Sequence, residues 1–210
     1  MRLKELHRKG MMGYHMRSRI FMGMLLLAVI VLAYGCAGGK AKGALDIRIT
    51  YDALNETDLA RMKHIEHGTP LEQAAIERFK EFYKIFSAQR INASFAEGYA
   101  GDAYFEDGIR QVKGRQNIKE YFLSNTGAFD ECTFDIKDVA YSPGNYYFRW
   151  IMHLKLKRDP DNPMEQPGIS HVRFNEHGQV VFQHDYWETL ALFERFPVMG
   201  SVIRWIKGRI

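Results

Sequence analysis

The chain has 210 residues, of which 46% are hydrophobic and 26% charged, a composition that suits one globular domain behind a leader. It carries 29 basic and 25 acidic residues, but residues 1–35 hold six of the bases and a single acid, Glu5. The rest of the chain, with 23 bases and 24 acids, is nearly neutral, so we expect no nucleic-acid partner. The two cysteines, Cys36 and Cys132, form no disulfide framework, and the Cys/His spacing does not support a zinc site.

The first 35 residues have the order of a targeting segment. Six Arg and Lys side chains precede the apolar run 20–32, which is short for a bilayer span of about 20 residues. The small residues before Cys36 resemble a bacterial lipoprotein signal, in which that cysteine is acylated and becomes the mature N-terminus. The resemblance implies a lipid anchor at Cys36 and a place in the bacterial cell envelope, facing the periplasm. An uncleaved membrane anchor and a misassigned start codon are the alternatives.

Residues 36–68 are predicted to form a tether and a short helix. The glycine-rich stretch 38–44 is typical of a flexible linker, and Asp58–Glu66 is the expected helix. A stronger boundary follows at Thr69-Pro70-Leu71-Glu72, where a capping threonine, a proline at the first helical position and a glutamate predict a helix start. Apolar residues then recur at helical spacing as far as Phe86. We therefore place the domain at residues 69–195.

The remainder of the domain is predicted to be mostly strand. A short helix is expected at Ala93–Gly98, a strand at Ala103–Asp107, a return strand at Ile109–Val112 and a helix from Gly114 to Phe122. Four longer strands follow, at about 132–141, 145–157, 168–175 and 179–187. Helices followed by a run of antiparallel strands predict an α+β domain, with helices covering one face of a curved sheet.

Residues 196–210 are predicted to form a basic amphipathic helix that begins at Pro197. Its cations Arg204, Lys207 and Arg209 alternate with apolar residues and one tryptophan, Trp205. Such a helix is typical of an anionic membrane surface. The alternative is a helix packed on the domain or across a homodimer.

Several segments in this order resemble the nuclear-transport-factor-2-like superfamily, which includes ketosteroid isomerases, limonene epoxide hydrolases and SnoaL-like polyketide cyclases. The resemblance covers about residues 70–195. It implies a cone-shaped, curved antiparallel sheet wrapped around N-terminal helices, with an apolar concave pocket. The segments that carry it are Tyr99 to Asp107, the run Gly114-Arg115-Gln116-Asn117-Ile118-Lys119-Glu120-Tyr121-Phe122, Arg173 to Val180, and His184-Asp185-Tyr186-Trp187-Glu188.

The resemblance implies roles for individual residues. Asp107 stands in the position of the isomerase base and Tyr83 in that of its oxyanion-hole tyrosine, while Ser170 replaces the partner acid. Asp185 matches the epoxide-protonating acid of the hydrolases. The positions of the hydrolase Arg-x-Asp pair hold Trp150 and Met152. The resemblance therefore implies neither the complete isomerase site nor the complete hydrolase site.

Alternation along the strands groups a set of side chains on the concave face. The expected catalytic residues are Asp107, Asp185 and Tyr83, because two carboxylates in one apolar pocket can divide into an acid and a base. In the alternatives, Asp107 caps the turn at Gly108, Asp185 bonds a neighbour, and Tyr83 belongs to the core. Histidines 153, 171 and 184 are expected on the outward face. The pocket is expected to be lined by Phe105, Trp150, Met152, Ser170, Val172, Gln183 and Trp187.

The sequence thus predicts a lipid-anchored envelope domain that binds a small, mostly apolar molecule. Cofactor-free acid/base catalysis of isomerase, cyclase or lyase type is one interpretation, with no cofactor or metal expected. The other is a non-catalytic domain for ligand binding or protein interaction. Whether the chain is an enzyme stays open at this point.

Overall fold

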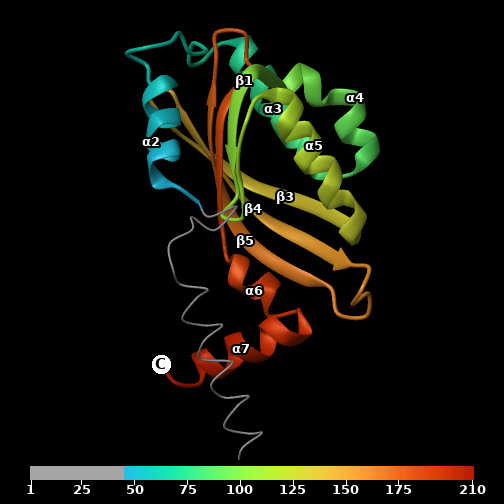
Figure 1. Ribbon diagram of the computed structural model, residues 1–210. Helices are drawn as coiled ribbons and strands as arrows, with labels where there is room; N and C mark the ends of the chain where they lie inside the picture. The colour runs from blue at the N-terminus through green and yellow to red at the C-terminus, as the bar shows by residue number, and fades with distance from the viewer. Residues whose placement is uncertain (1–44) are drawn as a thin grey trace, which may run out of the picture. The chain divides into compact units, whose positions relative to one another are not determined.

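The computed structural model describes residues 45–210, which form one compact unit with its own hydrophobic core (Figure 1). The expected leader, the lipidation site Cys36 and the glycine-rich stretch 38–44 lie outside the described residues. Within residues 45–210, no helix has both the length and the apolar character needed to cross a bilayer.

A six-stranded sheet organises the domain, and helices cover both of its faces. The strand order is β2-β1-β6-β5-β4-β3, and every neighbouring pair is antiparallel except β1 and β6, which are parallel. The predicted α+β class is therefore confirmed, with one parallel pair in an otherwise antiparallel sheet. The strands are β1 (Tyr99–Glu106), β2 (Gln111–Lys113), β3 (Phe129–Ser142), β4 (Asn145–Leu156), β5 (Met164–Phe174) and β6 (Val180–Trp187).

Three helices, α3 (Pro70–Lys84), α4 (Ala88–Gly98) and α5 (Arg115–Asn125), lie together on one face of the sheet (Figure 1). Helix α3 begins where predicted: the Thr69 side chain accepts a hydrogen bond from the Glu72 amide, and Pro70 occupies the first turn. A short 3₁₀ turn, η1 (Thr126–Ala128), follows α5. The buried side of α3, which includes Phe79, Phe82 and Tyr83, packs into the aromatic core.

The short helix expected at Asp58–Glu66 was wrong. That segment consists of turns and one bridge between His64 and Asn175, and the His64 ring contacts the backbone oxygens of Thr57 and Gly144. The helix of this region is α2 (Ile47–Glu56), capped by Asp46. It covers the opposite face of the sheet from α3–α5 (Figure 1), because its few buried positions pack against β1 and β6.

Strand β4 shows the alternation that positions the site. The predicted inward residues are all buried, while the residues between them face outward and are exposed or half-buried. Two C-terminal helices, α6 (Thr189–Phe193) and α7 (Pro197–Lys207), complete the chain. The buried inward set is Phe148, Trp150, Met152, Leu154 and Leu156.

Candidate functional site

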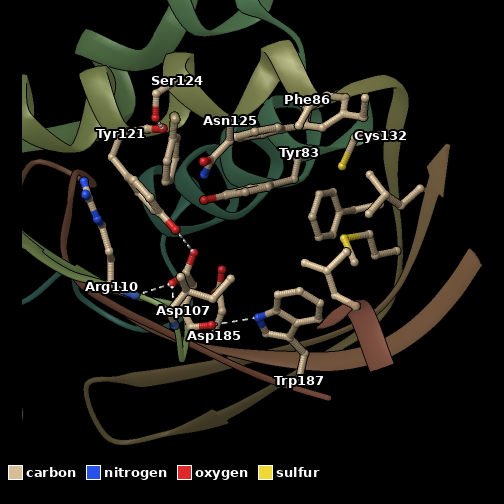
Figure 2. Close-up of a pocket in the computed structure, with 18 of the residues that line it drawn as sticks. Tyr83, Phe86, Asp107, Arg110, Tyr121, Ser124, Asn125, Cys132, Asp185 and Trp187 are labelled. Carbon is tan, nitrogen blue, oxygen red and sulfur yellow. Dashed lines mark hydrogen bonds between the residues drawn. The ribbon is translucent and has the colours of Figure 1, made fainter. Parts of the chain in front are cut away.

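A cavity of about 440 Å³ opens between α5, the concave face of β3 and β4, and α6. This volume lies in the range of small-molecule sites, and most of the wall is aromatic or aliphatic. Figure 2 shows Asp107 and Asp185 side by side at one end of the cavity, while Ser124 and Asn125 lie on a different part of its wall. The walls are built mainly by Phe86, Phe105, Phe122, Phe134, Trp150 and Met152.

Asp107 follows β1 at the mouth of the cavity, where the positive φ of Gly108 reverses the chain. Its Oδ1 accepts hydrogen bonds from the amides of Ile109 (3.0 Å) and Arg110 (2.9 Å), and its Oδ2 accepts one from the Tyr121 hydroxyl (2.6 Å). The carboxylate therefore caps the turn and also lines the cavity. Three donors hold it in one orientation, as a catalytic base or a ligand contact requires.

Asp185 projects from β6 into the same end of the cavity. Burial raises its pKa to about 7; hydrogen bonds from Ser170 and Gln183 oppose this, and the negative charge of Asp107 adds to it. The Gln183 amide donates to Oδ1 at 2.9 Å. Near neutral pH the group can thus exchange a proton with little driving force in either direction, as general acid/base catalysis favours.

Tyr83 touches the cavity with its ring, and its hydroxyl belongs to a buried hydrogen-bond network. It lies 2.8 Å from the Tyr99 hydroxyl and accepts from Gln183 Nε2 at 2.8 Å. Burial, together with the neighbouring Tyr99 and Asp185, raises the Tyr83 pKa well above 10. The hydroxyl therefore stays protonated, and through Gln183 it fixes the position of Asp185.

The predicted pocket residues divide into two groups. Phe105, Trp150, Met152 and Trp187 line the cavity, whereas Ser170, Val172 and Gln183 are buried behind its wall. The indole of Trp150 covers Ser170 on the cavity side: its Nε1 donates to Ser170 Oγ at 2.9 Å. Its ring fills the space over Gly168, where even a Cβ atom would collide with it.

Sequence reasoning missed Tyr121, Tyr99 and Arg110. Tyr121 bonds Asp107, Tyr99 bonds Gln183, and the Arg110 side chain lies over the Tyr121 ring. Ile118, Tyr121 and Phe122 are all buried on one side of α5, and this i, i+3, i+4 spacing was the signal that could have placed Tyr121 inside. No local pattern marks the other two.

Cys132 also reaches the cavity wall, and burial raises the pKa of its thiol to about 12, so the thiol is unreactive as a nucleophile. Among the described residues, no three His, Cys, Asp or Glu side chains gather where they could hold a metal ion.

Solved structures resemble this fold at low sequence identity. A candidate SnoaL-like polyketide cyclase from Jannaschia sp. CCS1 is 11% identical, with a TM-score of 0.52 over 60% of this chain and 94% of its own. An NTF2-like protein of unknown function from Burkholderia pseudomallei K96243 is 10% identical, with a TM-score of 0.52 over 60% of this chain and 96% of its own. A ketosteroid isomerase-like protein from Catenulispora acidiphila, solved with trimethylamine, is 12% identical, with a TM-score of 0.50 over 57% and 88%.

These three likenesses establish the fold alone. A comparison with curated proteins found no match. The family model of the SnoaL-like domain matches residues 79–183, half of the chain; the match includes most of the cavity wall and ends just before Asp185. This chain therefore belongs to the SnoaL-like domain family.

Proposed function

We propose that this SnoaL-like domain binds a small, mostly apolar molecule in its cavity and performs cofactor-free acid/base chemistry of isomerase, cyclase or lyase type. The observation that supports this best is the pair of carboxyl groups at one end of an apolar cavity. Burial raises the pKa of Asp185 to about 7, while Asp107 is held by three donors. Two carboxyl groups in such different surroundings can divide into an acid and a base.

In this proposal Asp107 removes a proton from the carbon next to a carbonyl. The bonding electrons of that C–H bond move toward the carbonyl oxygen, and protonated Asp185 donates its proton there, so an enol forms and the charge moves from Asp107 to Asp185. Gln183 and Tyr83 act as positioning residues, because they hold Asp185 and do not themselves reach the reacting atoms. Asp107 then returns its proton to a different carbon of a conjugated enol while Asp185 takes back the proton from the enol oxygen, which reforms the carbonyl, restores both carboxyl groups and completes an isomerisation.

A non-catalytic ligand carrier is the second candidate. It is favoured by Ser170, which is buried behind Trp150 where the related isomerases place an acid, and by the Tyr83 hydroxyl, which already bonds within the protein. A carrier would use the same apolar walls without proton transfer.

The decisive experiment separates binding from proton transfer. Native mass spectrometry identifies a molecule that co-purifies with the domain, and displacement of the uncharged dye Nile red measures occupancy of the cavity. The same preparations are incubated in D₂O with a panel of cyclic ketones, and deuterium incorporation is measured by mass spectrometry.

We expect Asp107→Asn to abolish deuterium incorporation and leave dye binding unchanged, while Asp130→Asn, an exposed carboxylate outside the cavity, serves as the matched control. Dye binding without exchange in the wild type would establish the carrier. Exchange that survives Asp107→Asn would remove Asp107 as the base.

The envelope location is a separate part of the proposal. It is supported by the order of basic, apolar and small residues before Cys36. Metabolic labelling with a fatty-acid analogue should label the wild type and not Cys36→Ser. A wild type that stays in the membrane without label would instead be held by an uncleaved anchor.

A further inference from the structure

Helix α7 is amphipathic, and its orientation is opposite to that of α3, whose apolar side is buried in the core. Gly200 is its only buried residue and lies against the backbone of Glu194. On the same side, Arg204 Nη1 donates to the Glu194 carbonyl at 3.2 Å, and Lys207 Nζ lies 2.5 Å from the Glu194 carboxylate. The polar side of α7 therefore faces the protein.

The apolar side of α7 faces solvent. Val198 is 78% exposed, Val202 53% and Trp205 59%. Successive residues of an α-helix are rotated by 100°, so these side chains, together with Met199 and Ile206, share one continuous face. Ile210, just after the helix, is also fully exposed. By contrast, α3 buries its apolar side in the core, with Phe79, Phe82 and Tyr83 each at most 6% exposed.

An apolar helix face that is held outward by contacts on its polar side needs a partner. We propose that this face of α7 inserts into the interfacial region of an anionic lipid bilayer. Charge favours that occupant. Lys207 pairs with Glu194 and Arg195 with Asp159, but Arg209 lies against Trp205 of the apolar face, and no acidic residue follows Glu194 in the sequence. Negatively charged headgroups attract such a segment, by about 1 kcal/mol per basic residue near the surface.

The arrangement of Trp205 and Arg209 fits the same partner. The Arg209 guanidinium lies over the Trp205 ring, 3.8 Å from its centre, and within the described residues no carboxylate pairs with it. Tryptophan prefers the headgroup level of a bilayer, and a long basic side chain beside it can reach phosphate while its carbons stay in the apolar layer.

A second copy of the chain fits this face less well. Stable protein interfaces use about 20 to 30 residues on each side. The apolar face of α7, together with Ile210, offers only six exposed large side chains. The proposed surface is independent of the cavity chemistry, so failure of either proposal leaves the other unaffected.

The test uses residues 45–210, which contain the whole core and lack the leader, with folding verified by circular dichroism. Co-sedimentation is measured with vesicles of phosphatidylcholine alone and of phosphatidylcholine mixed with phosphatidylglycerol. We expect binding to the mixed vesicles that weakens as salt is added, with a blue shift of Trp205 fluorescence. Val202→Glu should abolish it, Arg209→Gln should weaken it about fivefold, and Ser201→Ala, outside the apolar face, should leave it unchanged.

Two outcomes would overturn the proposal. One is the absence of sedimentation with mixed vesicles at low salt. The other is a dimer in analytical ultracentrifugation that Val202→Glu dissociates, which would assign the face to a second copy. Equal, salt-independent binding to both vesicle types would contradict the anionic part of the proposal.

Discussion

Two carboxyl groups, the buried Glu106 and the half-buried Asp185, stand on neighbouring strands of the sheet but face opposite sides. Glu106, at the end of β1, faces outward beneath α2, where its Oε2 accepts from the hydroxyls of Thr50 and Tyr104, both at 2.7 Å. Its Oε1 lies 3.6 Å from His184 Nε2. Asp185, on β6, faces the cavity and is held from one side by its neighbours, chiefly Gln183.

The comparison shows that burial by itself does not mark a functional carboxylate. Glu72, which is 1% exposed, makes the same point: burial opposes its ionisation, but hydrogen bonds from Tyr146, His67 and the Gly68 amide outweigh this and lower its pKa. Glu72 and Glu106 are surrounded by donors and have a structural role. Asp185 instead has cavity on one side, where a ligand could supply the missing partner.

The titratable groups on the two faces also have opposite effects on the way stability depends on pH. On the outer face, burial lowers the pKa of His171 to about 4 and also lowers that of His184. On the inner face, burial raises the pKa of Asp185 to about 7. Stability conferred by the neutral histidines is lost as the pH falls, whereas ionisation of Asp185 weakens the fold as the pH rises.

The largest expected effect is that of Asp185→Asn. Between pH 3.8 and about 7 the folded protein keeps a proton on Asp185 that the unfolded chain has lost, so ionisation costs up to about 4 kcal/mol above pH 7. Urea unfolding should show that the variant gains almost nothing at pH 4 and most near pH 8. A gain that does not depend on pH would mean that Asp185 is not destabilised by its ionisation.

Glu106→Ala should act in the other direction and cost about 3 kcal/mol, because it leaves the buried Thr50 and Tyr104 hydroxyls without their acceptor. The matched control Glu106→Gln keeps an acceptor oxygen and should lose less. Urea unfolding at pH 7 measures both. If Glu106→Ala were as stable as the wild type, the outer cluster would not be the closed structural site described above.

His171→Gln tests the pH dependence of stability that is expected from the outer face. Gln can still donate to Asn145, which His171 Nε2 approaches to 2.8 Å, so little change is expected at pH 7. As the pH falls from 6.5 to about 4, the wild type loses up to about 3 kcal/mol through this histidine and the variant does not. His153→Gln, on the same outward side of the sheet, is the control. Identical curves for His171→Gln and wild type would show that His171 does not contribute.

Tyr121→Phe should have the smallest effect, about 1.5 kcal/mol, because it removes one of three donors to the Asp107 carboxylate. Tyr141→Phe, at an exposed tyrosine, controls for the loss of a hydroxyl. Thermal unfolding measures both. In the deuterium-exchange assay Tyr121→Phe should slow exchange without abolishing it, since two backbone amides still orient Asp107. Complete loss would give Tyr121 a direct part in the chemistry.

The local sequence pattern was sufficient to predict α3 and β4, two of the elements that build the cavity wall. The capping signal at Thr69 and the period of α3, and the alternation along β4, appear in the sequence because each residue of a helix or strand faces a direction set by its own position. The same alternation separates Glu106 from Asp107 and His184 from Asp185 on the two faces. These features could therefore be predicted before any contact was known.

By itself, the amino-acid sequence determined the α+β class, the inward set of β4 and the place of Asp107 and of Asp185 near the end of a strand, each on its inward side. The tertiary structure alone decided that α2 covers the outer face, that β1 and β6 run parallel, and that Trp150 hides Ser170 from the cavity. It also brought Tyr121 to Asp107 and turned the apolar side of α7 outward. Periodicity tells which side of an element is apolar, but what that side meets depends on segments far away in the chain.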